Sequence, residues 1–412
     1  MTAEMNEISS CEVCGSQALV PVLDLGAHPM CDDLVPVGDA RECNEYPIRI
    51  MYCACCRTAH QRYQVPKQDL FPQTYHYRSR FTADVLTGMK GLVQRCEELL
   101  GSLASRKVLD VGCNDGSLLG FFRDKGATTI GIEPTGACAD ARAQGHVTYN
   151  HFLTPELASQ VAAEQGQPDV IVFTNVFAHI EDLGAVLESL RRLMSPTTVI
   201  VVENHYLGAV LDGNQFDTFY HEHPRTYSYT SFVRIAQSLS LAVFNVEFPA
   251  RYGGNIRVFM GQPGAHKVVT SAEVQALLER EAEFAERFEA MRRNVDAWRT
   301  GKRAAIEALV VKHGKLAAKA FPGRAAILVK LLGLDASMIS VVHEKPGSLK
   351  IGHYLPGTRI PIVSDDELFA SGDLTRPLLN LAWHISGEIR GYLTKQGYSG
   401  PIIDIVNPAD FA

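Results

Sequence analysis

The sequence predicts an α/β protein in three parts: a small N-terminal metal-binding module, a central Rossmann-like domain and a C-terminal Rossmann-like domain. Three observations lead to this prediction. Two C-x-x-C pairs lie within the first 56 residues, a strand, glycine turn and helix pattern begins at Lys107, and apolar strand-like runs alternate with helical or loop segments over the last hundred residues. At 412 residues the chain is also too long for one ordinary hydrophobic core.

The composition is that of a folded protein and does not favour a nucleic-acid or membrane partner. Hydrophobic residues make up 46% of the chain, and 39 Lys and Arg residues stand against 46 Asp and Glu residues, for a net charge of −7. A nucleic-acid groove or an anionic membrane surface would favour the opposite balance. The segment MTAEMNEISS lacks the pattern of a secretory signal, and no apolar run approaches the ~20 residues of a membrane span. We therefore expect a cytoplasmic protein.

Cysteines cluster near the start of the chain, where seven of the ten lie within the first 56 residues. Cys11 and Cys14 form one C-x-x-C pair, and Cys53 and Cys56 form a second. In a reducing compartment, two such turns favour a tetrahedral four-sulfur site for a structural Zn²⁺ over disulfides. Buried free thiols are the alternative, because cysteine packs well in cores. Cys55 could replace Cys53 or Cys56 as a ligand.

The segment KVLDVGCNDGSLLGFF, from Lys107, has the pattern of a strand, a glycine turn and a helix. Glycine lets the backbone approach a ligand, and the following helix offers unpaired N–H groups. The next predicted strand ends at Glu133, where a carboxylate can accept hydrogen bonds from both hydroxyls of a ribose, and a further strand ends at Asn175. Together these features resemble a class I S-adenosylmethionine-dependent methyltransferase domain, whereas a dinucleotide site would require the G-x-G-x-x-G signal. The predicted cofactor residues are Asp110, Gly112, Asn114, Glu133 and Asn175.

Motifs along almost the whole chain occur in the order found in bacterial sugar C-methyltransferases: the cysteine pairs, LFPQTYHYRS, LDVGCNDGSLL, NVFAHI, FYHEHPRTYS, YGGNIRVF and HYLPGTRIPI. The chain resembles the C-3 methyltransferases that act on nucleotide-linked 4-keto deoxysugars. The resemblance implies a zinc-binding domain over 1–72, a methyltransferase domain over 73–265, and a helical linker with a C-terminal α/β domain over 266–412 that helps to hold the sugar nucleotide.

The same resemblance implies roles for side chains in and around FYHEHP, residues 219–224. His223 is assigned as the base that removes the C-3 proton, since the unperturbed pKa of histidine lies near neutrality. Glu222 is assigned as an orienting or alternate acid/base group. Tyr220 and His179 are candidates to contact the sugar oxygens and the enolate, and Tyr75 to close the cleft.

Other histidines receive weaker assignments. A metal held by His221 and His223 is an alternative for FYHEHP, but the helical H-x-x-x-H spacing of such sites is absent. His221 could equally face away from the cleft. His151, His205 and His384 have no partner pattern and are expected to be ordinary surface or core histidines.

Expected substrate contacts are fewer and lie mostly on glycine-containing segments. Arg257 follows YGGN, so that a diphosphate contact and a strand-end salt bridge are both open. The full set of expected substrate contacts is Asn255, Arg257 and Lys350.

The C-terminal part is predicted to alternate strands, AAILVK, ISVVHE and PLLNLAW, with helices or loops. Before it, a capping box of Thr270 and Glu273 begins a helix over 271–299 that carries Leu277, Leu278, Phe284 and Phe288 on its packing face. FPGR and VVHEK depart from the resembled family, in which a glycine- and alanine-rich turn precedes a lysine and an aspartate commonly ends the next strand. These departures place the nucleotide contacts of this part in question.

The predicted activity is methyl transfer from S-adenosylmethionine to C-3 of a nucleoside diphosphate-linked 4-keto-6-deoxy sugar, dTDP rather than GDP, by a monomer or weak dimer. A neighbouring carbonyl makes this carbon nucleophilic once a base removes its proton. Methylation of another activated carbon or an oxygen is one alternative. A zinc-bearing regulatory or RNA-binding protein with a degenerate methyltransferase core is another.

Overall fold

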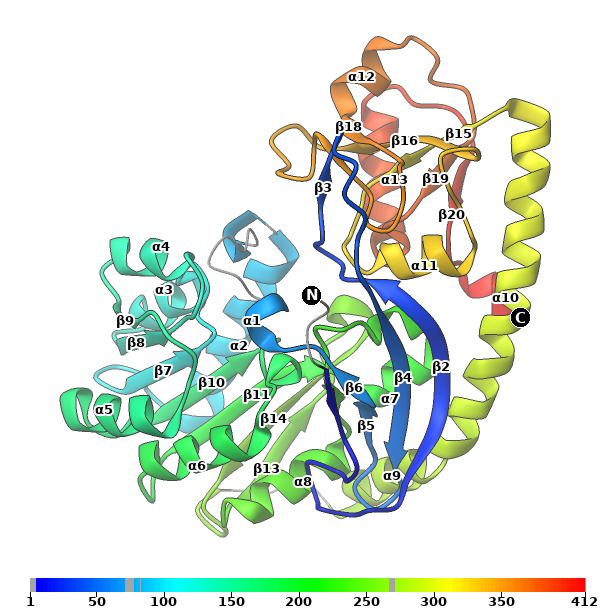
Figure 1. The fold of residues 1–412 in the computed structure, drawn as a ribbon. Helices are drawn as coiled ribbons and strands as arrows, with labels where there is room; N and C mark the ends of the chain where they lie inside the picture. Colours follow the sequence, from blue (N-terminus) through cyan, green and yellow to red (C-terminus); the bar gives the residue numbers. More distant parts are fainter. Residues whose placement is uncertain (1–4, 71–77, 82, 267–270, 412) are drawn as a thin grey trace.

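The protein has an N-terminal antiparallel module, a central α/β domain and a C-terminal α/β domain (Figure 1). The computed structural model describes residues 5–70, 78–81, 83–266 and 271–411. The three parts are in contact with one another. The N-terminal strands lie beside the central domain, and the long helix α10, Phe284–His313, contacts both the N-terminal module and the C-terminal sheet. Within the described parts of the chain, no helix has the length and apolar character that a membrane span requires.

The N-terminal module is a sheet of order β12-β5-β4-β2, all antiparallel. Its strands are β2, Leu19–Pro29, β4, Glu45–Cys53, and β5, Thr58–Gln61. In β4, alternate residues Tyr46, Ile48, Ile50 and Tyr52 are buried, which is the period of two expected of a sheet with one covered face. The fourth strand, β12, Arg225–Thr226, comes from the central part of the chain and directly follows FYHEHP.

Two small pairings complete this module. Strand β1, Asn6–Glu7, pairs with β6, Tyr63–Gln64. Strand β3, Val35–Pro36, pairs with β17, His353–Tyr354, and so joins the module to the C-terminal part.

The central sheet has the order β13-β14-β11-β10-β7-β8-β9. The five strands from β11 to β9 in this order are parallel, and β14 is antiparallel to its neighbours β11 and β13. Its parallel strands are apolar runs that become buried on both faces, as parallel sheets require. The chain order reverses between β7 and β10, and open α/β sheets bind ligands at the carboxyl ends of such strands. The strands are β7 Lys107–Val111, β8 Thr128–Ile132, β9 Val147–Tyr149, β10 Val170–Thr174, β11 Val199–His205, β13 Ala242–Glu247 and β14 Asn255–Gly261.

Helices cover the central sheet with their apolar faces. In α6, buried Leu183, Val186, Leu187 and Leu190 recur at helical spacing, and Asp182 caps the first turn by accepting from the Ala185 N–H at 2.9 Å. The helices of this part are α2 Ala83–Leu100, α3 Ser117–Arg123, α4 Cys138–Ala143, α5 Pro155–Gln165, α6 Leu183–Leu193, α7 Leu207–Asp212 and α8 Tyr229–Ser238, with short 3-10 turns at Phe177–His179 (η2) and Phe216–Thr218 (η3).

The C-terminal sheet is parallel throughout, with the order β18-β16-β15-β19-β20. The chain order again reverses at its first strand, between β15 and β19. The elements are β15 Leu316–Lys319, β16 Ile339–Glu344, β18 Ile362–Ser364, β19 Leu378–Asn380, β20 Ile402–Asp404, α11 Ala325–Leu331, α12 Asp365–Ala370, α13 Ser386–Lys395 and the 3-10 turn Trp383–Ile385 (η5).

Two predictions for the C-terminal part were wrong in detail. AAILVK forms helix α11 and not a strand, because a short run that is apolar at every position carries no periodicity. The predicted helix 271–299 is two helices, α9, Ser271–Ala282, and α10, in which Leu277, Phe284 and Phe288 are buried but Leu278 is 38% exposed. Thr270 of the expected capping box lies outside the described residues.

An ion pair with a buried arginine joins the N-terminal module to the central domain. The guanidinium of Arg225 is fully buried, its Nη1 lies 2.6 Å from Glu12 Oε2, and its Nε donates to Tyr227 Oη at 3.0 Å. It also donates to the backbone oxygens of Ile180 and Glu181, directly after η2. One buried side chain therefore fixes the position of two segments of the central domain against the module.

We expect Glu12→Gln to lower the free energy of unfolding by about 3 kcal/mol, because the buried guanidinium of Arg225 is then left without its counter-charge. Glu7→Gln is the matched control, since Glu7 pairs with Arg62 at 2.7 Å on the surface, where removing one partner should lower the free energy of unfolding far less. Denaturant unfolding in zinc-containing buffer measures both. An equal loss of unfolding free energy in the two variants would show that the buried Arg225 does not need the charge of Glu12.

Candidate active site

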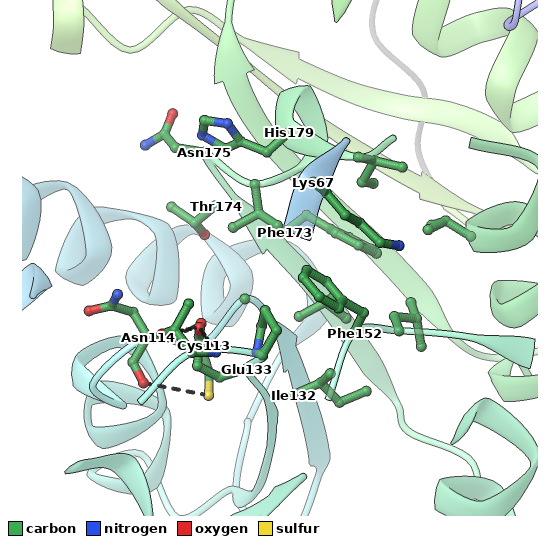
Figure 2. Close-up of a pocket in the computed structure, with 18 of the residues that line it drawn as sticks. Lys67, Cys113, Asn114, Ile132, Glu133, Phe152, Phe173, Thr174, Asn175 and His179 are labelled. Carbon is green, nitrogen blue, oxygen red and sulfur yellow. Dashed lines mark hydrogen bonds between the residues drawn. The ribbon is translucent and has the colours of Figure 1, made fainter. Parts of the chain in front are cut away.

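The cavity at the carboxyl ends of the central strands has a volume of about 650 Å³. All five residues predicted to bind the cofactor line it: Asp110, Gly112, Asn114, Glu133 and Asn175. In Figure 2, Asn114 and Glu133 lie on one side of this space, and Asn175 and His179 lie on the other.

The glycine turn fits a ligand that needs close backbone approach. Gly112 has φ +76°, a conformation that L side chains rarely adopt, and a Cβ on it would lie 2.4 Å from Val176 Cγ2. Its N–H donates to Ile132 O at 2.7 Å, which fixes the turn against the end of β8. Asn114 and Asn175 also have positive φ angles, 49° and 55°. Unusual backbone conformations of this kind cluster at binding sites.

The Glu133 carboxylate is held in a fixed orientation. Oε2 accepts from the Asn114 N–H at 3.0 Å, and Oε1 accepts from the Thr135 N–H and hydroxyl at 2.9 and 2.6 Å. A carboxylate has about four acceptor positions, so Glu133 can accept about one further hydrogen bond, as from a ribose hydroxyl. Burial and the charge of Glu133 raise the pKa of nearby Asp110 to about 8. The free acceptor position of Glu133 is compatible with the ribose contact expected for it.

The FYHEHP segment forms another wall of the same cavity, to which it contributes Tyr220, Glu222 and His223. His223 Nδ1 lies 3.0 Å from Thr218 O, and because a carbonyl only accepts, Nδ1 carries the hydrogen. Nε2 of the neutral ring is therefore the basic nitrogen. The His223 ring lies 4.2 Å from that of Tyr220 and 4.8 Å from that of His179, centroid to centroid.

Burial sets the protonation of these groups. It lowers the pKa of His223 well below its usual value, and the neighbouring rings of His179 and His205 lower it further. Burial also lowers the pKa of His179 to about 4. Burial, reinforced by the charge of Asp32, raises the pKa of Glu222 to about 8. At pH 7 the rings of His179 and His223 are therefore neutral, and Glu222, like Asp110, is mostly protonated.

The N-terminal module holds FYHEHP from the other side. The Gln61 N–H donates to Pro224 O at 2.8 Å, and Gln61 Nε2 donates to Tyr220 O at 3.3 Å. His221 Nε2 donates to Tyr46 O at 3.0 Å, so this ring points into the module and not into the cavity. The two histidines face different surroundings, which excludes the alternative of a metal shared by His221 and His223.

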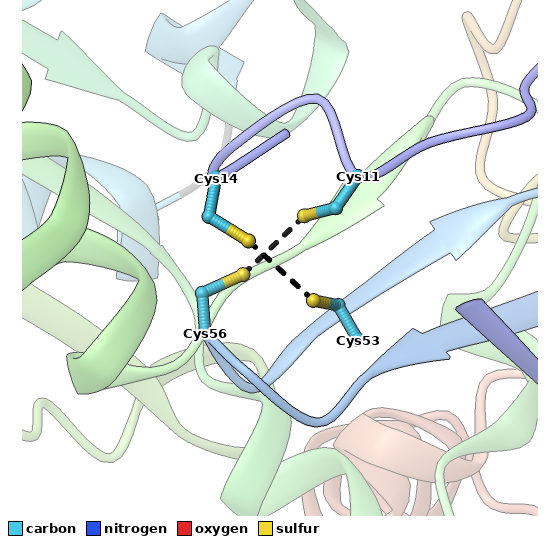
Figure 3. A group of neighbouring side chains, drawn as sticks. All are labelled: Cys11, Cys14, Cys53 and Cys56. Carbon is cyan, nitrogen blue, oxygen red and sulfur yellow. Dashed lines mark hydrogen bonds between the residues drawn. The ribbon is translucent and has the colours of Figure 1, made fainter. Parts of the chain in front are cut away.

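The metal site lies instead at the predicted cysteines. The Sγ atoms of Cys11 and Cys56 are 3.4 Å apart, those of Cys14 and Cys53 are 3.6 Å apart, and all four lie within 4.8 Å of one another (Figure 3). A tetrahedral Zn²⁺ with bonds of about 2.3 Å places sulfurs roughly 3.8 Å apart, so the set fits this ion. Among the described residues it is the only such group of possible metal ligands. Cys55 is exposed, and its Sγ donates to Ser16 Oγ.

The predicted substrate contacts do not line the cavity. Arg257 binds Glu203 at 2.7 Å and Glu247 at 3.2 Å, so the salt-bridge alternative holds for it. Asn255 Nδ2 donates to Asn175 Oδ1 at 3.2 Å and supports that residue. Lys350 donates to Phe321 O at 2.7 Å. Tyr75 lies outside the described residues.

Sequence reasoning missed cavity residues that only the fold brings together. His151, His205 and His384 all line the cavity, and so does Arg324 of the C-terminal domain. His205 could have been found, because it ends β11 at the same sheet edge as Asn175. His384 and Arg324 could not, since their positions depend on how the two α/β domains meet.

Comparisons with known proteins agree with this geometry. Three family models match consecutive segments: "Putative zinc binding domain" over residues 11–71, "Methyltransferase domain" over 81–245 and "C-methyltransferase C-terminal domain" over 250–401. The chain is 29% identical over 394 residues to the C-methyltransferase NovU of Streptomyces niveus, covering 93% of this chain and 91% of NovU.

More distant similarities cover smaller shares of the chain. A ubiquinone biosynthesis O-methyltransferase of Rhodopseudomonas palustris is 33% identical over 113 residues, which are 26% of this chain and 44% of that protein. The magnesium protoporphyrin IX methyltransferase of Synechocystis PCC 6803 with bound SAH is similar in structure at 14% identity and a TM-score of 0.34, over 43% of this chain and 83% of that one. A likeness this distant carries no weight for function.

The chain is an S-adenosylmethionine-dependent C-methyltransferase with a tetracysteine zinc site. The similarity to the C-methyltransferase NovU extends over nearly the whole chain. The predicted fold class, enzyme class, cofactor and metal are thereby confirmed.

The zinc site gives a direct prediction. We expect Cys14→Ser to lose most of the about one Zn²⁺ per chain that the wild type binds, because the tetrahedral set is then incomplete. Cys55→Ser is the matched control and should retain the ion, since this neighbouring cysteine is outside the set. Metal analysis of the purified proteins measures both. Equal zinc loss in the two variants would make Cys55 a ligand.

Proposed function

We propose that the enzyme methylates C-3 of a nucleoside diphosphate-linked 4-keto-6-deoxy sugar. The observation that carries this proposal is the position of His223, a neutral and buried histidine with its basic Nε2 available, in the same cavity as the predicted cofactor residues. The order of motifs that resembles sugar C-methyltransferases supports the choice of acceptor. So does the acidic net charge of −7, which disfavours a nucleic-acid substrate.

The proposed chemistry uses the protein for proton transfer and charge stabilisation. His223 Nε2 takes the C-3 proton, and the electron pair of that C–H bond moves into an enolate whose charge rests on the C-4 oxygen. Tyr220 and protonated Glu222 donate hydrogen bonds to sugar oxygens. Bound S-adenosylmethionine supplies an electrophilic methyl group to C-3. Asp110, Gly112, Asn114, Glu133 and Asn175 would hold it, and all five line the cavity that His223 also lines.

The test is incubation with S-adenosylmethionine and 4-keto-6-deoxy sugars linked to dTDP or GDP, followed by mass spectrometry. We expect one of these substrates to gain one methyl group on C-3. Failure of both nucleotide series would reject it.

The base is tested by a matched pair of variants. We expect His223→Gln to slow loss of a C-3 deuteron to solvent by about 100-fold or more, the contribution of a positioned general base. His221→Gln, two residues away, should exchange at nearly the wild-type rate because His221 faces the N-terminal module. Proton NMR of the substrate follows the exchange. Wild-type exchange by His223→Gln would remove His223 from this role.

The raised pKa of Glu222 predicts the alkaline side of the pH profile. A protonated Glu222 can donate a hydrogen bond, and this donor is lost as the pH rises through about 8. We therefore expect kcat to fall across that range, and Glu222→Gln to retain activity without this fall, because the amide keeps a donor at every pH. An inactive Glu222→Gln would instead indicate that an ionised Glu222 acts as a base.

A further inference from the structure

Arg324 brings a permanent positive charge from the C-terminal domain into the cavity of the central domain. It follows β15 in the turn FPGR, at the point where the order of the C-terminal strands reverses. Its side chain is 11% exposed and lines the cavity beside His384. Guanidinium groups stay protonated at every physiological pH.

Three contacts hold this guanidinium. Nη1 donates to Thr218 Oγ1 at 3.0 Å, Nε lies 3.3 Å from Asp217 Oδ2, and the group lies 5.8 Å from the centre of the Trp383 ring. Trp383 Nε1 donates to the same Asp217 oxygen at 2.9 Å. A guanidinium has five N–H donors, and the described residues provide no hydrogen-bond partner for Nη2 of Arg324. It is therefore oriented and still has donors for a ligand.

Thr218 links this group to the base. Its hydroxyl accepts from Arg324, and its carbonyl accepts from Nδ1 of His223. Arg324 and His223 are thus positioned by the same buried residue of η3. A base and a cation held on one residue suit a reaction in which a proton leaves carbon and negative charge appears nearby.

The electrostatic surroundings agree with this geometry. Burial and the charge of Arg324 lower the pKa of His205 to about 3 and that of His384 to about 3. Both side chains line the cavity, so the positive potential of Arg324 reaches the part of the cavity lined by His205 and His384. An anion formed beside His223 would be stabilised there.

We propose that Arg324 is a catalytic residue that stabilises the enolate by donating a hydrogen bond to its oxygen. This role rests on the proposed function. As the C-3–H bond breaks, the proton goes to His223 Nε2, a double bond forms between C-3 and C-4, and the π pair of the carbonyl moves to the oxygen that Arg324 faces. When C-3 later bonds to the methyl group, the methyl–sulfur bond breaks and its electron pair stays on the sulfur of S-adenosylhomocysteine. The carbonyl is restored and Arg324 is unchanged.

The experiment compares wild type, Arg324→Gln, Arg324→Lys and Arg299→Gln. Arg299 lies on α10 and is 52% exposed, which makes Arg299→Gln a control with the same loss of charge. Two quantities are measured: the rate of C-3 deuteron exchange with S-adenosylhomocysteine bound, and KM and kcat for the sugar nucleotide. Circular dichroism establishes that each variant is folded.

We expect Arg324→Gln to lower both the exchange rate and kcat by about 100-fold, the usual effect of losing one oxyanion donor, with KM changed less than about threefold. Arg324→Lys should recover part of the loss, and Arg299→Gln should match wild type. A raised KM with unchanged kcat and exchange would make Arg324 a ground-state contact, for example to the diphosphate, and overturn the proposal. Unchanged kinetics would also overturn it. Wild-type enzyme that neither exchanges nor methylates any sugar nucleotide would reject the proposed function and this role together.

Discussion

The pairing of β12 with β5 is the constraint on which the proposed active site depends. Strand β12 begins immediately after FYHEHP, and its Arg225 is in register with His60 of the N-terminal module. The backbone of FYHEHP therefore ends in a sheet whose adjacent turn carries the zinc ligands Cys53 and Cys56. Hydrogen bonds from Ser228, which precedes α8, and from Ser231 within α8 to Cys56 O anchor the same turn to the central domain. The turn with the zinc ligands thus helps to fix the segment that carries His223.

Three parts of the structure come together around one cavity. The central sheet contributes the glycine turn and Asn175, the module fixes FYHEHP from behind, and the C-terminal sheet contributes Arg324 and His384. The cavity lies near the points where the strand orders of the two α/β sheets reverse, which is where open α/β sheets place ligands. Because these groups are buried, His179 and His223 stay neutral and Asp110 and Glu222 stay mostly protonated near pH 7, as acid and base chemistry at that pH requires.

The sequence was most informative where local pattern determines structure. Strand, turn and helix around Gly112, the acidic end of β8 and the four cysteines were all predicted from spacing, because each depends on residues close in the chain. AAILVK was misassigned, since an unbroken apolar run fits a buried helix as well as a strand. Arg257 was ambiguous because its partner Glu203 is distant in sequence. Arg324 was noticed only as a departure from a pattern, since its function depends on the contact between two domains.

Hydrogen exchange of backbone amides, with and without removal of zinc by a chelator, tests most directly whether the module holds FYHEHP. We expect chelation to lower the protection of the Gln61 amide, bonded to Pro224 O, and of the His223 amide, bonded to Tyr220 O at 2.9 Å. Amides of β10 in the central sheet should keep their protection. Loss of protection confined to the cysteine turns, with the amides of FYHEHP unchanged, would show that the module does not hold this segment.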